Sequence, residues 1–238
     1  MSGKNYRFAL TVLGCLLVAG AAFAGNITGT VSYEGGIPGS AKRPLKMDAD
    51  PGCAKKHSGP VMPEFLILGD GNTLGNVFVS VKSVPGSHAT PSEPVVLDQN
   101  GCKYMPHVMG VMVNQPFKIL NSDGLLHNVH SLPKANTSFN RAMPASVKES
   151  EFKFTKPEAA FKIKCDVHPW MGAYVQVMEH PFFDVTGADG KFEIKGLPAG
   201  TYEVEAWHEK LKIKTASVTV GASDTQTADF KFTKPSKK

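Results

Sequence analysis

The sequence has little that points to a membrane-spanning protein, a nucleic-acid partner or a dithiol enzyme. Its 238 residues include four cysteines and contain neither a C-x-x-C pair nor a C-x-x-C-H motif, which excludes a thioredoxin-type dithiol and a c-type haem attachment. Lysine, arginine and acidic residues are interspersed and the net charge is only +5, so no basic stripe favours nucleic acid. After residue 24 no apolar run is long enough to span a bilayer, and no long segment has a helical period.

The N-terminus has the pattern of a secretory signal peptide. A short basic region precedes an apolar run from Phe8 to Ala21, and Ala22-Phe23-Ala24 gives the small-x-small pattern of a cleavage site. We therefore expect residues 1–24 to be removed before Gly25 and the protein to be periplasmic or secreted. Cys15 leaves a lipoprotein as the alternative, in which this residue would carry the membrane anchor.

Cleavage before Gly25 leaves three cysteines, an odd number for an oxidising compartment. Cys53 follows Asp-Pro-Gly and Cys102 follows Asn-Gly, so both lie in loop-like surroundings. We therefore predict a Cys53–Cys102 disulfide and a free or metal-bound thiol at Cys165. The alternative is that all three thiols are reduced.

Apolar residues alternate with polar ones along most of the chain. Val77, Val79 and Val81 give one such period of two, and later segments repeat it. The 23 glycines and 17 prolines punctuate these short runs. Short strands with frequent turns predict an all-β protein built as a sandwich or barrel.

A possible metal site begins at the strand that ends in Cys165. The period of two places Cys165 on the apolar face with Phe161 and Ile163, and the following loop offers His168 and Met171. A buried thiolate without a partner is costly, so an ion is a physical reason for its position.

A further imidazole must come from another strand. The best source is the segment that contains His127 and His130, which are an odd number of residues apart and therefore face opposite sides of a strand. Only one of them can face the site. Thiolate, two imidazoles and a thioether together select copper, whereas zinc rarely binds a thioether.

These motifs carry a family resemblance. His127-Asn128-Val129-His130 together with Cys165-x-x-His168-Pro169-x-Met171 resembles the cupredoxins, most closely the amicyanin and plastocyanin branch, over roughly residues 76–178. The resemblance implies a Greek-key sandwich and one type 1 (blue) copper ion. Its implied metal ligands are His127, Cys165, His168 and Met171. It selects His127 over His130 and implies that Asn128 braces the cysteine loop by hydrogen bonding.

The resemblance also implies a function. We expect single-electron transfer between redox partners such as a cytochrome, a dehydrogenase or a reductase, and no enzymatic activity. It further implies that His168 reaches a solvent-facing apolar docking patch, for which the candidates are Leu125, Leu126, Pro169 and Trp170. The alternatives are a periplasmic copper carrier or buffer, and a surface β-sandwich interaction protein with a structural metal site.

Some residues depart from the family pattern or lie outside it. Asp166 stands directly after the cysteine, where a small hydroxyl residue is usual, and an acid there could lower the potential or alter the bracing. His107, His180 and His208 could form a second metal site, but none of their spacings is typical of metal ligands. We expect them to brace contacts between strands or domains.

A second resemblance concerns the C-terminal region. The segment GADGKFEIKGLPAGTYEVEAW resembles the transthyretin-like fold of carboxypeptidase regulatory-like domains, and NITGTVSYEGG resembles that family's opening strand. We therefore expect an N-terminal β segment over 25–75, a cupredoxin-like copper domain over 76–180 and a transthyretin-like β-sandwich over 181–238. The copper domain either follows the N-terminal segment as a consecutive domain or is inserted in a split sandwich, with residues 25–47 returning to pair with 184–232.

Overall fold

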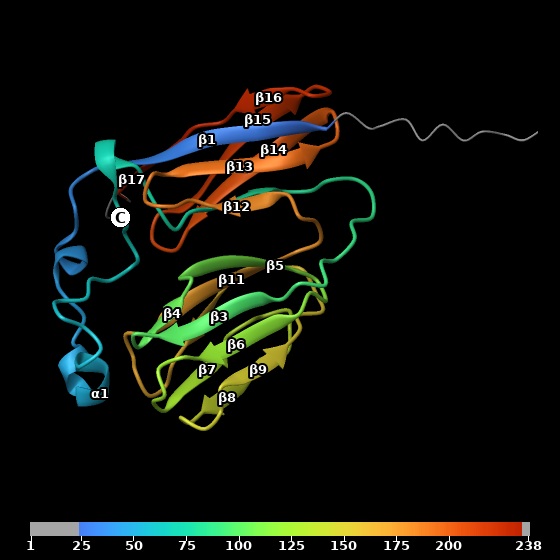
Figure 1. Ribbon diagram of the computed structural model, residues 1–238. Helices are drawn as coiled ribbons and strands as arrows, with labels where there is room; N and C mark the ends of the chain where they lie inside the picture. The colour runs from blue at the N-terminus through green and yellow to red at the C-terminus, as the bar shows by residue number, and fades with distance from the viewer. Residues whose placement is uncertain (1–23, 235–238) are drawn as a thin grey trace, which may run out of the picture.

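The computed structural model describes residues 24–234, and the expected signal peptide lies outside them except for its last residue. The described chain is all-β, as the alternating pattern predicts, and its sheets form two sandwiches that stack on one another (Figure 1). Among the described residues, no helix has the length and apolar character needed to cross a membrane.

The first sandwich combines the two ends of the chain with two strands from its middle. One sheet has the order β13-β1-β16, with β17 also paired to β1, and the other has the order β12-β2-β14-β15. The strand bounds are β1 Gly25–Glu34, β2 Phe78–Val81, β12 Phe183–Val185, β13 Lys191–Leu197, β14 Gly200–His208, β15 Lys212–Val220, β16 Thr225–Thr227 and β17 Phe230–Thr233.

Pairing of β1 joins the N-terminal segment to the C-terminal region. Its Ile27 lies opposite Ile194 of β13 in an antiparallel ladder, and its Val31 lies opposite Phe230 of β17 in a parallel one. These side chains share one buried core. Sequentially distant strands therefore build one sandwich, and the chain between them forms a second body.

The second sandwich holds the predicted metal-binding motifs. Its sheets have the orders β5-β11-β10-β7-β8 and β4-β3-β6-β9, and its core contains Phe117, Ile163 and Val175. The strand bounds are β3 Val95–Asn100, β4 Lys103–Met105, β5 Val108–Met112, β6 Phe117–Asn121, β7 His127–Ser131, β8 Asn140–Met143, β9 Glu149–Phe152, β10 Glu158–Lys164 and β11 Gly172–Met178.

The strand pairing differs at one point from the expected copper domain over 76–180. Strand β2 lies inside those limits, yet Val79 pairs with Ala206 of β14 in the first sandwich. All four residues of β2 are buried. A short strand that is buried on both faces fits the centre of a sheet, and the alternating pattern alone did not indicate which sheet that is.

A long connection leads from β1 to β2 along the second sandwich. It contains η1 Gly39–Lys42, η2 Met47–Ala49, α1 Pro51–Ala54 and η3 Asp70–Asn72. Figure 1 shows α1 beside the second sandwich, far from the strand that precedes it. Between the two sandwiches, Phe78 of β2 shares a buried cluster with Val108 of β5 and Met178 of β11.

Candidate metal centre

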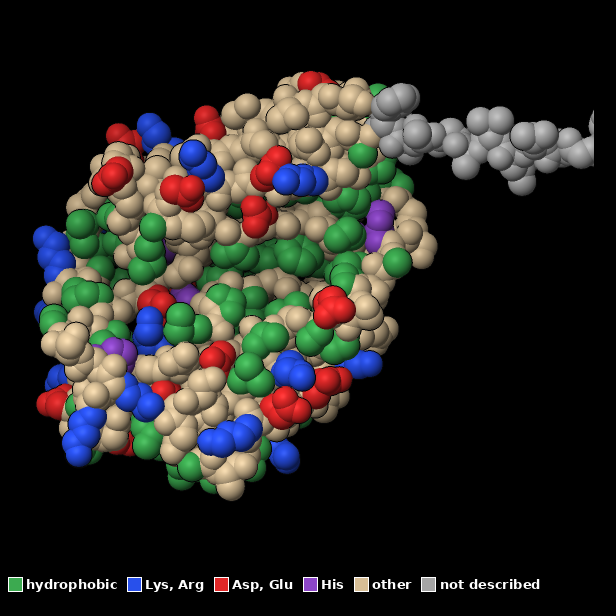
Figure 2. Space-filling model, viewed as in Figure 1, with side chains coloured by type: hydrophobic (Ala, Val, Ile, Leu, Met, Phe, Trp, Pro, Cys, Tyr) green, Lys and Arg blue, Asp and Glu red, His purple; other side chains and the backbone are tan. Residues whose placement is uncertain are grey.

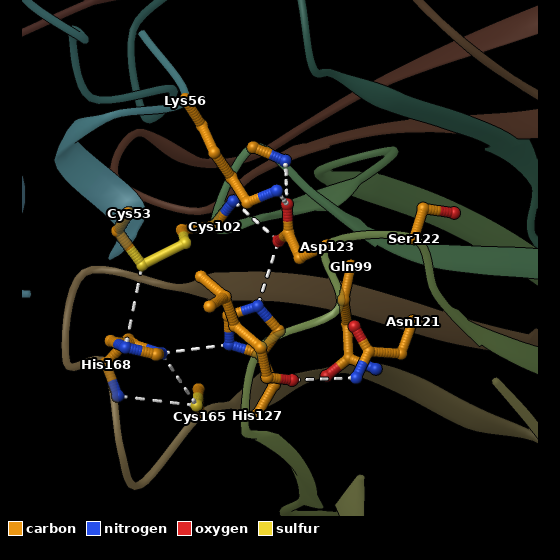
Figure 3. Close-up of polar contacts among 12 residues, drawn as sticks. Cys53, Lys56, Gln99, Cys102, Asn121, Ser122, Asp123, His127, Cys165 and His168 are labelled. Atoms are coloured by element: carbon orange, nitrogen blue, oxygen red, sulfur yellow. Dashed lines mark hydrogen bonds and ion pairs between the residues drawn. A yellow bond between two sulfur atoms is a disulfide. The ribbon is translucent and has the colours of Figure 1, made fainter. Parts of the chain in front are cut away.

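Two neighbouring strands bring His127 and Cys165 to the same end of a sheet. His127 is the first residue of β7, and Cys165 directly follows the last residue of β10. The two strands are antiparallel, with His130 opposite Lys164. The start of one strand therefore lies beside the end of the other, and their side chains meet there (Figure 3).

The loop between β10 and β11 folds back on the Cys165 sulfur. The Cys165 amide donates to the carbonyl of Met171 (3.2 Å), and the Met171 amide donates to the carbonyl of His168 (2.9 Å). The His168 amide lies 3.3 Å from Cys165 Sγ. Met171 is buried in the same core as Cys165, so this short loop places three of the four expected ligands in one buried region.

The site has three donor atoms at close range. His127 Nδ1 lies 2.9 Å from His168 Nδ1, and Cys165 Sγ lies 3.9 Å from that same nitrogen. All three side chains are buried. The thiol of Cys165 is the free cysteine of the described chain. This set of one sulfur and two imidazole nitrogens suits copper.

Each imidazole is held from its outer side by a carboxylate. Asp123 Oδ2 lies 2.9 Å from His127 Nε2, and Asp50 Oδ2 lies 2.9 Å from His168 Nε2. An ionised carboxylate only accepts hydrogen bonds, so both Nε2 atoms carry hydrogen. The two Nδ1 atoms then direct lone pairs toward one another at 2.9 Å, which is repulsive unless a proton or a metal ion lies between them.

The pKa values of His127 and Cys165 favour a cation between the donor atoms. Burial alone would lower the pKa of His127, but Asp123 and the Cys165 sulfur outweigh it and raise that pKa to about 9. Burial also opposes ionisation of Cys165, yet His127 and nearby amides lower its pKa. In the metal-free protein His127 therefore holds a proton at neutral pH, and a metal ion would replace that proton.

The Asp123 carboxylate is itself held by hydrogen bonds and an ion pair. Its carboxylate accepts from the amides of Gly101 and Cys102, both at 2.8 Å, and lies 3.1 Å from Lys56 Nζ. Burial would raise its pKa, but the hydrogen bonds from His127, Cys102 and Lys56 lower it to about 2. Asp123 is therefore ionised and orients His127.

Asn128 braces the cysteine loop. Its Oδ1 accepts from the Asp166 amide at 2.7 Å and lies 3.3 Å from Cys165 Sγ. Its Nδ2 donates to Asn140 at 2.6 Å. The side chain of Asn128 therefore links β7, β8 and the residue after the thiol.

His130 and Asp166 lie on the outer side of the sheet. His130 Nδ1 lies 2.9 Å from Asp166 Oδ2, and Lys164 Nζ lies 2.7 Å from the other oxygen of that carboxylate. These partners, Lys164 first, lower the pKa of Asp166. The acid after the cysteine therefore interacts with surface groups, and its hydrogen bond from Asn128 (3.2 Å) ties it to the brace.

The connection that contains α1 covers His168. Asp50 Oδ1 accepts from the amide of Gly52 (2.7 Å) as the N-cap of α1, while Oδ2 contacts His168. Cys53 of the same helix is bonded to Cys102, as the sequence predicts, and its Sγ lies 3.6 Å from His168 Nε2. The disulfide thus fastens α1 over the imidazole (Figure 3).

This cover corrects the expectation of a solvent-facing patch around His168. The residue is only 2% exposed. Leu125 packs against Gly52 of the cover, and Trp170 donates its indole hydrogen to the Cys102 carbonyl at 3.1 Å. Leu126 is 53% exposed and Pro169 is exposed as well. The outer edge of the imidazole nevertheless faces protein, because a segment more than a hundred residues away in sequence packs on it.

The three histidines considered for a second metal site make structural contacts. His107 contacts the Gly172 carbonyl (2.9 Å) and Glu209 (2.6 Å) across the two sandwiches. His180 and His208 each accept a backbone amide two residues further on. Within residues 24–234, groups of three metal-binding side chains occur only around His127 and His168.

Asp50 and Asp123 are the functional residues that the sequence pattern did not reveal. Asp123 precedes His127 by four residues in a turn, and Asp50 begins an Asp-Pro-Gly helix start. Both patterns indicate only a turn or a cap. Their contact with an imidazole depends on tertiary packing.

The comparison with family models finds one match. The carboxypeptidase regulatory-like domain matches residues 168–233, which run from the loop of His168 through the last strand of the first sandwich. No curated protein matches the chain.

Several solved structures are similar to part of the chain. A copper-containing nitrite reductase from Thermus scotoductus SA-01 is 20% identical over 41% of this chain and 25% of its own, with a TM-score of 0.34. A mutant of amicyanin in the Cu(I) form is 21% identical over 42% of this chain and 98% of its own, with a TM-score of 0.32. An oxidised amicyanin mutant has 21% identity and a TM-score of 0.33 over the same shares. The chain is thus similar to a carboxypeptidase regulatory-like domain at its C-terminal end.

Proposed function

We propose that the protein is an exported mononuclear type 1 copper protein that transfers single electrons between redox partners. His127, Cys165 and His168 are the strong ligands, and Met171 is the weak axial ligand. The observation that carries this proposal is the convergence of two imidazole lone pairs, 2.9 Å apart, beside a buried thiol whose pKa is lowered.

Bound copper would supply a one-electron couple between Cu(I) and Cu(II). The residues of the chain keep the donor positions nearly unchanged between the two states. Asp123 and Asp50 hold the two rings from outside, and Asn128 holds the loop of Cys165. A rigid, buried donor set requires little rearrangement when one electron is gained or lost.

The same contacts favour electron transfer over a copper carrier or an enzyme. A carrier must release its metal, whereas α1 and its disulfide cover His168. A metal enzyme usually keeps an open position for substrate, whereas the three donors are buried. The disulfide also fits an oxidising compartment, in line with the proposed export.

The test is a redox titration of the copper-loaded protein. We expect one electron per protein and, in a Met171→Leu variant, retention of the visible band with a higher reduction potential, because loss of a weak thioether favours Cu(I). Rapid loss of copper to a chelator from the wild-type protein, without reversible redox behaviour, would support the carrier instead.

A further inference from the structure

Neither of the two imidazoles expected to bind the metal is accessible to a redox partner at the surface. His127 is fully buried and His168 is 2% exposed. On its outer side His168 meets Asp50 (2.9 Å) and the sulfur of Cys53 (3.6 Å). Electrons must therefore enter and leave through another side chain that contacts the site and also reaches the surface.

Trp170 meets both conditions. Its ring centroid lies 5.0 Å from that of His168, and the residue is only partly buried. Together with Met171 it lines a cavity of about 410 Å³ that also receives Tyr174 and Lys210. The cavity is lined by residues of both sandwiches. In the view of Figure 2, basic, acidic and histidine side chains lie close together in part of the recess between the sandwiches. We call the cavity the basic groove.

Positive charge predominates in the basic groove. It is lined by five cationic side chains, namely Arg43, Lys46, Lys103, Lys162 and Lys210.

The two carboxylates of the groove already have partners inside the protein. Glu64 lies 3.3 Å from Lys103, and Glu209 lies 2.6 Å from His107 and 3.3 Å from Lys210. Arg43, Lys46 and Lys162 are exposed, so they leave an excess of positive charge that faces solvent.

We propose that the basic groove is the surface for electron exchange and that the redox partner is a protein with acidic side chains at its docking face. Trp170 lies between His168 and that partner. One electron passes from Cu(I) to a one-electron acceptor in the partner, so that Cu(II) forms and no bond or proton is exchanged. This inference rests on the proposed copper function.

Charge complementarity supports this choice of partner. A cationic cleft with low-dielectric walls attracts anionic groups and raises the rate of encounter. Segment 43–46 reaches the groove, and the residues directly after it cover His168. The same connection therefore covers His168 on one side of the site and supplies positive charge to the basic groove on the other side.

The first test measures anion binding without electron transfer. The reduced or metal-free protein would be titrated with hexacyanochromate(III), a paramagnetic anion that broadens nearby NMR signals. We expect broadening at residues that line the groove and its loss in an Arg43→Gln, Lys46→Gln, Lys162→Gln variant. Broadening confined to another surface, or none, would overturn the groove.

The second test measures electron exchange. The Cu(I) protein would be oxidised by hexacyanoferrate(III) at low ionic strength. The triple variant should react roughly tenfold more slowly. With the cationic oxidant tris(1,10-phenanthroline)cobalt(III), the triple variant should react faster than the wild type.

Lys162→Gln and Lys153→Gln form a matched pair for that test. Both lysines are exposed, and Lys153 does not line the groove. Docking in the groove predicts a slower reaction for Lys162→Gln only. Equal slowing in both variants would show a general charge effect and overturn the proposal.

Trp170 is tested separately. Trp170→Leu should slow both oxidants by the same factor, several-fold, after the rates are corrected for the measured reduction potential, and Trp170→Phe should restore most of the rate. Unchanged rates in Trp170→Leu would remove Trp170 from the route. Absence of a visible copper band would instead refute the copper function, and the anion-binding result would still stand.

Discussion

Asp50 and His168 are 118 residues apart in the sequence and are joined by a 2.9 Å hydrogen bond between a carboxylate oxygen and Nε2. The same carboxylate caps α1 through the amide of Gly52. One side chain thus begins a helix and orients a candidate copper ligand, so changes in the covering segment should be visible at the metal.

Asp50→Asn tests the charge beside His168. Asparagine is as good an N-cap as aspartate, so α1 should remain while an anion is lost close to the metal. The copper potential should rise, because a nearby negative charge stabilises Cu(II) over Cu(I). Spectroelectrochemistry measures the shift. Asp48→Asn, an exposed acid of the same segment, is the control, and an equal shift there would show that contact with His168 is not its cause.

Removal of the disulfide should both destabilise the protein and loosen its metal. Replacing Cys53 and Cys102 by alanine opens a loop of 49 residues, and the chain-entropy model gives a loss of about 4 kcal/mol in the free energy of unfolding. Copper should also pass to a chelator faster, because α1 is no longer fastened over His168. Denaturant unfolding and chelator competition measure the two effects. Unfolding at lower denaturant with unchanged copper loss would mean that the cover does not retain the metal.

The histidine pair on β7 tests which imidazole binds. His127 is buried beside Cys165, whereas His130 contacts Asp166 on the outer side of the sheet. His127→Ala should weaken copper binding and remove or reshape the visible band, and His130→Ala should leave the band in place. Copper titration followed by absorbance distinguishes the two. Loss of the band in His130→Ala alone would show that the ligand assignment on β7 is wrong.

The stability of the metal-free protein should depend on pH through His127. Its pKa rises from 6.5 to about 9 on folding, so the folded state binds the proton more tightly than the unfolded state. This stabilisation is fully present below pH 6.5 and is lost as the pH rises through about 9. The lowered pKa of Cys165 contributes stability of the opposite sign over the same range, so the fall is best measured without the thiol. Chemical denaturation of Cys165→Ser across pH 6 to 10 should show the fall, because Asp123 still holds His127, and the His127→Gln, Cys165→Ser double variant should lack it. Matching profiles of the two variants would contradict the raised pKa.

Local patterns predicted much of the fold and of the site. The period of two at Phe161, Ile163 and Cys165 indicated a strand with a buried thiol, and β10 has this form. Loop-like surroundings predicted the Cys53–Cys102 bond, which the structure confirms. Because His127 and His130 are an odd number of residues apart, strand alternation predicted that they face opposite sides of the sheet. The strand and histidine predictions depend on residues close together in sequence, and the disulfide prediction depends on the local surroundings of two cysteines 49 residues apart.

Contacts between residues far apart in the chain could not be predicted as well from the sequence. The resemblance of the N-terminal segment to an opening strand left two arrangements, and the pairing of Val31 with Phe230 supports the split sandwich. Nothing near His168 indicated that Asp50 and Cys53 would cover it, so the expected exposed imidazole was wrong. Similarly, the sequence of β2 did not indicate which sheet the strand joins, because a strand buried on both faces fits either sandwich.

The most direct test of the account is the optical spectrum of the oxidised, copper-loaded protein beside that of Cys165→Ser. A thiolate bound to Cu(II) in a trigonal set with two imidazoles should give an intense charge-transfer band in the visible, and the serine variant should lose it because a hydroxyl cannot supply the soft thiolate donor. A wild-type protein that binds copper without this band, or a serine variant that keeps it, would contradict the proposed metal centre.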